Sequence, residues 1–365
     1  MSKSSDNVLL ATRKGLIRMT NKGGSWNSEL LSFSGIALSY AFQNPHDDVI
    51  WAALDTDHWG PKLHRSKDKG KSWEDVGMPT YPEDDEASPG RPASLDYIWL
   101  IANGHEDDPK RLYLGTEPGG LFQSDDGGDS FHLVKGLWNQ PSRMEHWFGG
   151  GRDYPGLHSV VIDPRDRNRV LIGISVAGVF ESLDDGETWQ PRNKGLTADY
   201  LPNPHVEVGH DPHSLVISPS NPDVLWQQNH VGIFRSEDGA KNWTNISHPD
   251  GPAKFGFPII VDEDDAETAW VTPAVSDEER IAINGAMCVA RTNDGGKSWD
   301  IFRKGLPQSG SFDVVFRHAF DKSGDRLMMG TTTGNLFVSE DRGESWDTVS
   351  TFLPPIYSLR FVPIK

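Results

Sequence analysis

The sequence has almost no cysteine, no long apolar run and no excess of basic residues. Its single cysteine, Cys288, excludes an internal disulfide framework and is typical of a reducing compartment. No run of 18 apolar residues occurs, so no membrane span is predicted. The first residues lack the apolar core of a secretory signal, and we therefore expect a cytoplasmic protein. The net charge of −18 argues against nucleic acid as a partner, because phosphates require a basic surface.

A short phrase is present seven times: Ser or Thr, then Asp, then Gly, then Ser or Thr followed by an aromatic residue. The copies, two of them degenerate, occupy residues 19–26, 66–73, 124–131, 182–189, 236–243, 292–299 and 339–346. Their final aromatic residues are 47 to 58 positions apart. An evenly spaced repeat of this length, rich in short apolar segments, is typical of a propeller or array.

Each phrase is suited to a turn between two strands. Its Asp can accept hydrogen bonds from turn N–H groups, and its Gly can adopt a positive φ. Strand-like segments precede the phrase in each repeat, and the innermost ones are apolar runs at 157–164, 213–219, 257–262 and 312–318. Four strands in each of seven repeats predict an all-β, seven-bladed β-propeller that occupies residues 1–365 as one domain.

The two ends of the chain predict how the ring closes. Residues 7–15 resemble the second strand of a blade, and residues 356–363 resemble a first strand without a blade of its own. We expect the C-terminal strand to pair with the N-terminal blade, which would remove the exposed sheet edges of an open array.

The phrase S-x-D-x-G-x-[S/T]-W resembles the Asp-box, or BNR repeat, of sialidases and related propellers. The resemblance covers nearly the whole chain and implies that the boxes lie on the face opposite the substrate mouth. The chain is most similar to single-propeller bacterial proteins labelled as BNR-repeat glycosyl hydrolases. Other propellers with such boxes are xyloglucan-active hydrolases, sortilin-type receptors and a photosystem II assembly factor.

The sequence departs from two of these patterns. Sialidases have six blades and an Arg-Ile-Pro stretch near their start, whereas seven repeats are present here and Arg18 is followed by Met19. The xyloglucan-active enzymes use two propellers that face each other, and this chain has one. The resemblance therefore implies the fold and a glycosyl-hydrolase-like protein, but not a typical sialidase.

Counting from the repeated phrases predicts which residues meet at the mouth. Glu117 and Asn229 occupy equivalent positions after the second strand, and His158 and His213 open two inner strands. Two long connections, 136–156 and 195–212, enter the same part of the ring, and loops of this length are usually functional. Histidine is concentrated in and beside these connections, at His146, His158, His205, His210, His213 and His230. His58 is a further candidate on another blade.

Three hypotheses for this mouth follow. In a glycosidase-like site, carboxylates such as Glu117, Glu145 and Asp211 would flank a glycosidic bond. In a metal site, His158, His213 and His230 would bind a divalent ion such as Zn, Mn or Fe. In a noncatalytic pocket, the mouth would recognise a carbohydrate or another small polar ligand. The residues expected to contact a ligand are His158, His213, Asn229, His230, Arg143, Trp147 and Arg152.

Recognition of a carbohydrate or small polar ligand is the leading functional prediction, and hydrolysis is left open. The alternatives are a protein-interaction scaffold similar to the photosystem II assembly factor, and a His-rich metal-dependent enzyme. The sequence predicts neither the substrate nor the oligomeric state.

Overall fold

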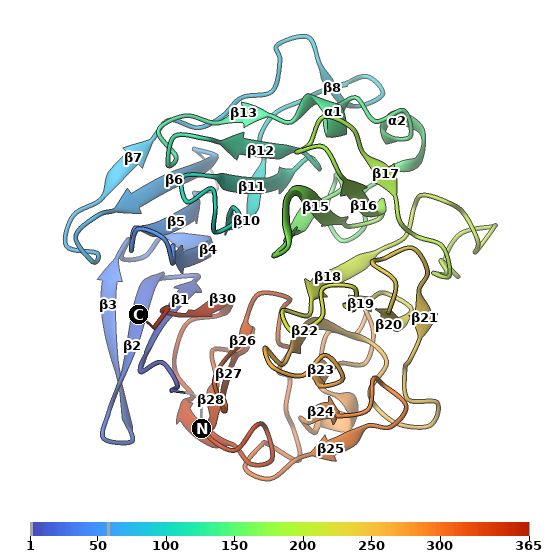
Figure 1. The fold of residues 1–365 in the computed structure, drawn as a ribbon. Coiled ribbons are helices and arrows are strands. Elements are labelled where there is room, and N and C mark those ends of the chain that lie inside the picture. Colours follow the sequence, from blue (N-terminus) through green and yellow to red (C-terminus); the bar gives the residue numbers. More distant parts are fainter. Residues whose placement is uncertain (1–2, 57–58, 365) are drawn as a thin grey trace.

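Seven four-stranded antiparallel sheets are arranged as blades around a central axis (Figure 1). This architecture is seen in a computed structural model that describes residues 3–56 and 59–364. The protein is therefore a seven-bladed β-propeller, as the repeats predict. The innermost strand of each blade lies nearest the axis, and the chain leaves each blade at its outer strand.

In blades 1 to 4 the strands follow one another from the inner to the outer edge of each sheet. Blade 1 contains β30 (Ile356–Phe361), β1 (Asn7–Thr12), β2 (Gly15–Lys22) and β3 (Ser25–Ser32). Blade 2 contains β4 (Ala37–Gln43), β5 (Ile50–Asp55), β6 (Pro61–Ser66) and β7 (Glu74–Val76). Blade 3 contains β10 (Tyr97–Asn103), β11 (Leu112–Glu117), β12 (Leu121–Ser124) and β13 (His132–Leu133). Blade 4 contains β14 (Leu157–Asp163), β15 (Asp166–Ile174), β16 (Gly178–Ser182) and β17 (Gln190–Pro191).

Blades 5 to 7 complete the ring. Blade 5 contains β18 (Pro212–Ile217), β19 (Leu225–Asn229), β20 (Gly232–Ser236) and β21 (Thr244–Asn245). Blade 6 contains β22 (Gly256–Val261), β23 (Ala269–Pro273), β24 (Val289–Thr292) and β25 (Asp300–Phe302). Blade 7 contains β26 (Phe320–Ser323), β27 (Arg326–Gly330), β28 (Leu336–Ser339) and β29 (Asp347–Ser350).

The remaining elements are short and lie in the connections. They are the hairpin β8 (Glu86–Ser88) and β9 (Arg91–Pro92), the helices α1 (Lys135–Trp138) and α2 (Arg143–His146), and a 3-10 turn at Ile283–Gly285. Across residues 3–56 and 59–364, no helix has the length and apolar character needed to cross a membrane.

The ring closes as predicted. Strand β30 pairs antiparallel with β1, and Leu9 lies opposite Arg360 while Val8 lies opposite Phe361. The first blade therefore combines both ends of the chain, and Figure 1 shows the red C-terminal strand beside the blue N-terminal ones. In this mixed blade the inner strand β30 is paired with β1.

The repeated phrases form the turns between the third and fourth strands. In the copy at 182–189, Ser182 Oγ donates to Asp184 Oδ1 at 2.8 Å, and Gly186 N donates to Ser182 Oγ at 2.8 Å. The same carboxylate accepts Thr188 N at 2.9 Å and Thr188 Oγ1 at 2.6 Å. Equivalent bonds occur in the other copies from residue 66 onward. The degenerate first copy also joins the third and fourth strands of its blade, β2 and β3, but by a shorter turn in which Gly24 N donates to Asn21 Oδ1.

Apolar side chains of the second and third strands fill the spaces between blades. Trp51, Trp226 and Trp270, all fully buried, lie in the second strands of three blades. A Cβ added at Gly128 of the repeated turn would lie 2.2 Å from the Trp51 ring, so glycine allows that turn to approach the neighbouring blade. The interior is thus a series of inter-blade cores surrounding the axis.

The inner strand of blade 7 is displaced from its predicted position. The apolar run 312–318 is irregular, and the strand that pairs with β27 is Phe320–Ser323. Asp313 holds the irregular segment in place by accepting hydrogen bonds from Ser311 and Asn335. Val314 O also accepts a hydrogen bond from Thr332 N in the turn between β27 and β28. These contacts hold the segment in place without a regular strand, and Arg317 and His318 at its end line the mouth cavity.

Candidate functional site

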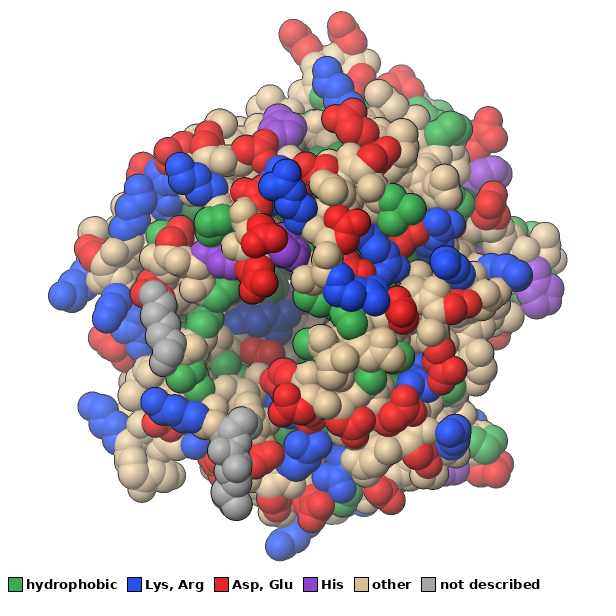
Figure 2. All heavy atoms as spheres, viewed as in Figure 1, with side chains coloured by type: hydrophobic (Ala, Val, Ile, Leu, Met, Phe, Trp, Pro, Cys, Tyr) green, Lys and Arg blue, Asp and Glu red, His purple; other side chains and the backbone are tan. Residues whose placement is uncertain are grey.

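A cavity of about 590 Å³ opens at the mouth of the ring, on the end where second strands turn into third strands. Its aromatic walls include Tyr97, Trp99, Tyr200 and Phe257. The cavity also receives residues of the long 136–156 connection and of the loop after β23. A second hollow of about 620 Å³ lies along the inner strands further down the axis. In the view of Figure 2 the centre of the ring is hollowed, and acidic and basic side chains are mixed around it.

Bulges at the starts of inner strands determine which side chains reach this axis. The register of the first and second strands shifts between Leu38 and Tyr40, Ile98 and Leu100, Leu157 and Ser159, Pro212 and Ser214, and Gly256 and Ile259. A bulge re-aims a side chain by leaving an extra residue without a ladder partner. The residues inside the first four bulges are Ser39, Trp99, His158 and His213, and all except His158 line the mouth cavity.

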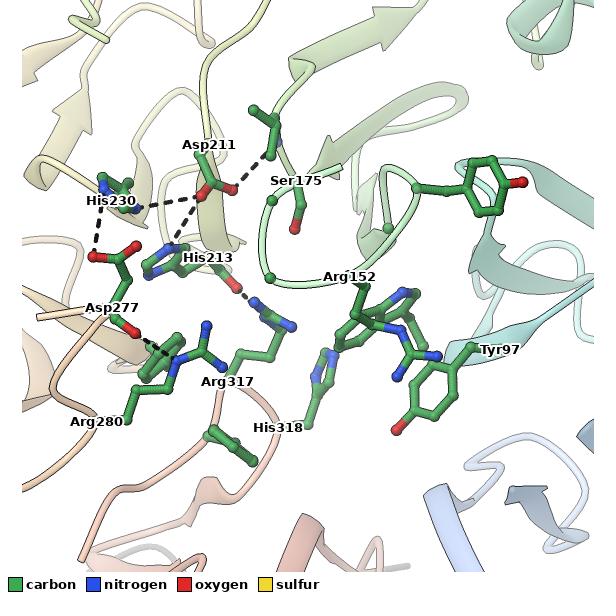
Figure 3. A pocket seen from close by; sticks show the side chains of 18 of the residues that line it. Tyr97, Arg152, Ser175, Asp211, His213, His230, Asp277, Arg280, Arg317 and His318 are labelled. Carbon is green, nitrogen blue, oxygen red and sulfur yellow. Dashed lines mark hydrogen bonds and ion pairs between the residues drawn. The ribbon is translucent and has the colours of Figure 1, made fainter. Parts of the chain in front are cut away.

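Blade 5 brings Asp211, His213 and His230 together on one wall of the cavity (Figure 3). Asp211 Oδ2 lies 3.5 Å from His213 Nε2 and 3.5 Å from His230 Nδ1. Asp211 immediately precedes β18, and His213 is the bulged residue that follows Pro212. A backbone hydrogen bond from His230 N to Asp211 O, at 2.9 Å, holds the turn after β19 against this strand start.

The surroundings of the cluster fix each of its side chains. His213 Nδ1 lies 2.7 Å from the Gly256 carbonyl oxygen, and its ring stacks on Phe257 at 4.9 Å. His230 Nε2 lies 4.0 Å from Asp277 Oδ1. Burial alone would raise the pKa of Asp211, but the two histidines hold it well below its usual range. The neighbouring Asp211 carboxylate in turn raises the pKa of His230.

Three arginines line the same cavity: Arg152, Arg280 and Arg317 (Figure 3). The Arg317 guanidinium lies 4.7 Å from the Trp99 ring, and its Nε donates to the His213 carbonyl oxygen at 2.8 Å. Burial lowers the pKa of Arg317 to about 10, although Asp211 acts in the opposite direction. Among the residues that the structure describes, no carboxylate forms an ion pair with Arg317.

Arg317 and His318 separate the mouth cavity from the second hollow, because both residues line both spaces. Burial holds the pKa of His318 well below its usual value. The mouth cavity therefore ends on a charged arginine and a neutral imidazole.

Arg280 extends over the cavity from the loop after β23. Its Nε donates to the Asp277 carbonyl oxygen at 2.9 Å, and its guanidinium lies 5.6 Å from the Phe257 ring. The elongated loop of blade 6 thus contributes Asp277 and Arg280 to the mouth. The charged residues of the cavity consequently come from blades 2, 5, 6 and 7 and from the 136–156 connection, with Asp55 at the end of β5 supplying the charge of blade 2.

Glu117 and Arg152, both candidates from the sequence, form an ion pair with each other. Glu117 is 2% exposed, and its Oε2 accepts Arg152 Nε. Burial raises the pKa of Glu117 while the charge of Arg152 opposes that shift. Arg152 lines the cavity and lies 4.4 Å from the Tyr97 ring, but Glu117 is behind it.

Other candidates lie away from the cavity. Glu145 is exposed on helix α2 beside His146. Arg143 donates to the carbonyl oxygens of Trp138 and Glu86 and so ties the long connection to the β8 hairpin. Trp147 is buried against Phe180, with ring centroids 5.1 Å apart. The structure thus gives Arg143 and Trp147 packing contacts rather than places on the cavity wall.

The equivalence of His158 and His213 holds for the backbone but not for the rings. His158 Nε2 lies 2.7 Å from the Pro212 carbonyl oxygen, at the start of the next inner strand, and its Nδ1 lies 3.0 Å from Ser159 Oγ. His213 contacts the next blade through Nδ1 instead, which leaves Nε2 facing Asp211. His158 therefore lines the second hollow rather than the mouth cavity, and it is not one of the three residues grouped with Asp211.

Asn229 is also turned away, because its Nδ2 donates to Gln227 Oε1 at 3.0 Å inside blade 5. His205 is exposed, and His210 Nε2 lies 2.8 Å from the Val206 carbonyl oxygen. His58 lies outside the described residues.

Sequence reasoning missed Arg317, Arg280 and the tyrosines of the wall. Arg317 was hidden inside an apolar run that looked like a strand, although the charged Arg-His pair at its end was a signal against a buried strand. Arg280 belongs to the long loop after β23, in which no site residue was predicted.

No protein-family model matches the chain. The oligoxyloglucan-reducing end-specific xyloglucanase of Emericella nidulans is 24% identical over 213 residues, which are 54% of this chain and 23% of that relative. The match thus extends over only about a quarter of the length of this curated relative.

Solved structures share the fold. An ancestral GH74 enzyme has a TM-score of 0.60 at 18% identity, over 85% of this chain and 38% of that one. YCF48 from Cyanidioschyzon merolae has a TM-score of 0.56 at 13% identity, over 98% of this chain and 97% of that one. These likenesses concern the propeller itself.

Proposed function

We propose that the protein recognises a carbohydrate derivative, or a similar small polar ligand, that carries an anionic group. The observation that carries the proposal is the convergence of Arg152, Arg280 and Arg317 on one cavity with aromatic walls. A guanidinium removed from water is costly unless an opposite charge meets it, and a planar carboxylate or phosphate oxygen pair is its natural partner. The anionic group of the ligand would meet Arg317, and the aromatic walls would contact its rings.

Two further observations support a carbohydrate class of ligand. The curated relative of Emericella nidulans acts on oligoxyloglucan, and a GH74 enzyme has the same fold. The matching hydrogen bonds of six turns support the proposal that the repeated phrase is an Asp-box.

We propose recognition rather than hydrolysis by two carboxylates. That chemistry needs a carboxylic acid and a second carboxylate flanking one bond. Glu117 is in an ion pair with Arg152, Glu145 lies on the surface, and Asp211 is held ionised between two histidines.

Isothermal titration calorimetry against three probes tests the proposal: a neutral xyloglucan oligosaccharide, a uronic-acid oligosaccharide of equal size and a hexose phosphate. We expect an acidic probe to bind and the neutral one to bind much more weakly, with affinity falling as salt rises. Arg317→Met should weaken binding by at least about 30-fold, because loss of one partner of a buried charge pair costs at least about 2 kcal/mol. Arg280→Ala, in an exposed loop, tests the same wall without risk to the core.

Arg167→Met is the matched control, since Arg167 is exposed on β15 away from the cavity. Binding by the uronic acid but not the phosphate, or the reverse, identifies the anionic group. If wild-type protein binds none of the probes at millimolar concentration, or if Arg317→Met and Arg280→Ala bind like wild type, the proposal is wrong. The protein-interaction scaffold then becomes the better explanation of the propeller.

A further inference from the structure

The three side chains Asp211, His213 and His230 present one ligand atom each to a single point on the cavity wall. These atoms all lie within 4.8 Å of one another. Two of the separations, Asp211 Oδ2 to His213 Nε2 and to His230 Nδ1, are both 3.5 Å. Hydrogen bonds of this type measure about 2.7–3.2 Å, so the spacing is too long for direct bonding between the carboxylate and the rings.

The same spacing fits an ion placed between the three atoms. Zinc binds imidazole nitrogen and carboxylate oxygen at about 2.0–2.2 Å in tetrahedral geometry, which separates neighbouring ligand atoms by about 3.4 Å. An octahedral site with the same bonds would require about 3.0 Å between neighbouring ligands. The two separations measured from Asp211 Oδ2, both 3.5 Å, agree with the tetrahedral value.

The contacts around the cluster favour lone pairs that point toward one another. His213 Nδ1 is 2.7 Å from the Gly256 carbonyl oxygen, which requires Nδ1 to carry the proton and leaves Nε2 as a free lone pair. Asp277 near His230 Nε2 favours a proton there and leaves Nδ1 toward Asp211. Val176 N donates to Asp211 Oδ1 at 3.3 Å, so that Oδ2 faces the histidines. A second contact that fixes the ring of each ligating histidine is the usual arrangement around protein-bound metals.

We infer that Asp211, His213 and His230 form a binding site for a divalent transition-metal ion, with zinc the best fit. Three protein ligands leave a fourth position, and here that position faces the mouth cavity. The ligand chemistry, two imidazoles and a carboxylate without a thiolate, suits zinc, iron(II) and manganese(II). This site differs from the His158, His213 and His230 set predicted from the sequence, because Asp211 takes the place of His158.

The site stands on geometry alone and extends beyond the proposed recognition of an anionic ligand. Arg317 and the cluster are adjacent, since Arg317 Nε donates to the backbone of His213. An anionic group bound in the cavity would therefore meet both the ion and a guanidinium.

The experiment uses the full chain, stripped with a chelator and dialysed against zinc chloride, followed by elemental analysis and titration calorimetry. We expect one zinc per chain in the wild type. Asp211→Asn and His230→Ala should lose more than about 100-fold in zinc affinity, because even loss of a supporting contact costs about 10- to 100-fold. His205→Ala, on the same connection but exposed, is the matched control and should retain one zinc.

Folding is checked by thermal melting without metal, where Asp211→Asn and wild type should both unfold cooperatively. Iron(II) and manganese(II) are titrated in parallel. If either ion binds more tightly than zinc, the site is retained and that ion is its preferred metal. The inference is overturned if folded wild type binds no transition metal, or if both cluster variants bind zinc like wild type. If the protein binds a metal ion but none of the anionic probes, the metal site is retained and the proposed function is rejected.

Discussion

Arg169 is a buried cation that joins blade 4 to blade 5, and its replacement by methionine should destabilise the ring measurably. Its Nη1 lies 2.7 Å from Asp163 Oδ2 and its Nε lies 2.7 Å from Glu181 Oε1. Its Nη2 donates to the Gly239 carbonyl oxygen, in the repeated turn of the next blade, at 2.9 Å. Methionine retains most of the apolar stem but none of these bonds.

The magnitude follows from what the substitution leaves behind. Removing one partner of a buried ion pair costs about 3–5 kcal/mol. Asp163 keeps Arg165 and Glu181 keeps Arg192 as partners, so the lower value applies, about 3 kcal/mol. The unfolding entropy of about 2.1 cal/mol/K per residue makes 1 kcal/mol equivalent to about 1.3 °C for a chain of this length. The melting temperature should therefore fall by about 4 °C.

Scanning calorimetry of Arg169→Met beside Arg167→Met measures this difference. Arg167 lies two residues earlier on the same strand and is exposed, so its substitution should change the melting temperature by less than about 1 °C. Equal melting temperatures for the two variants would refute the reasoning that buried charge links these blades.

Three further perturbations test other parts of the ring. Burial would raise the pKa of Asp163, but its arginine contacts lower that pKa to about 2. The stability that the ionised carboxylate contributes is therefore present above about pH 4 and is lost as the pH falls toward 2. In urea titrations across this pH range, Asp163→Asn should lose less stability than the wild type does. Asp184→Ala removes the hydrogen bonds of one repeated turn and should cost about 1–2 kcal/mol by chemical denaturation, and no change would contradict the turn's structural role. Gly115→Ala would place a Cβ 2.2 Å from the Leu157 carbonyl oxygen of the next blade and should cost at least about 1–3 kcal/mol, whereas Gly77→Ala meets nothing within 4 Å and should melt like wild type.

The fold could be predicted because its determinants are local and repeated. Each turn is encoded by a few adjacent residues, as at Ser182, Asp184 and Gly186, and the apolar runs mark the inner strands. The closure of β30 on β1 follows from counting strands at the two ends. Residues 312–318 are the exception, because their apolar pattern fits either a strand or a buried irregular segment. The contacts of Asp313 with Asn335, 22 positions apart, decide between them.

The candidate site could be located but not assembled from the sequence. Counting from the turns identified His213 and His230 as mouth residues, Asp211 was a candidate from the long 195–212 connection, and the structure groups all three. Counting also placed Glu117 beside them, but Glu117 pairs with Arg152 across 35 positions of sequence. Such pairs depend on where a long connection folds back, and no periodic pattern records that.

The ring orientations of His158 and His213 show the physical limit of pattern reasoning. Both residues sit in equivalent bulges, and both contact the first carbonyl of the next inner strand. His158 uses Nε2 for this contact and places Nδ1 against Ser159, whereas His213 uses Nδ1 and keeps Nε2 for Asp211. The ring orientation of each histidine reflects its local partners rather than its place in the repeat. The blade repeat thus supplies equivalent backbone positions around the axis, and the nonrepeated neighbours of His213 convert one of them into a site that can bind an ion.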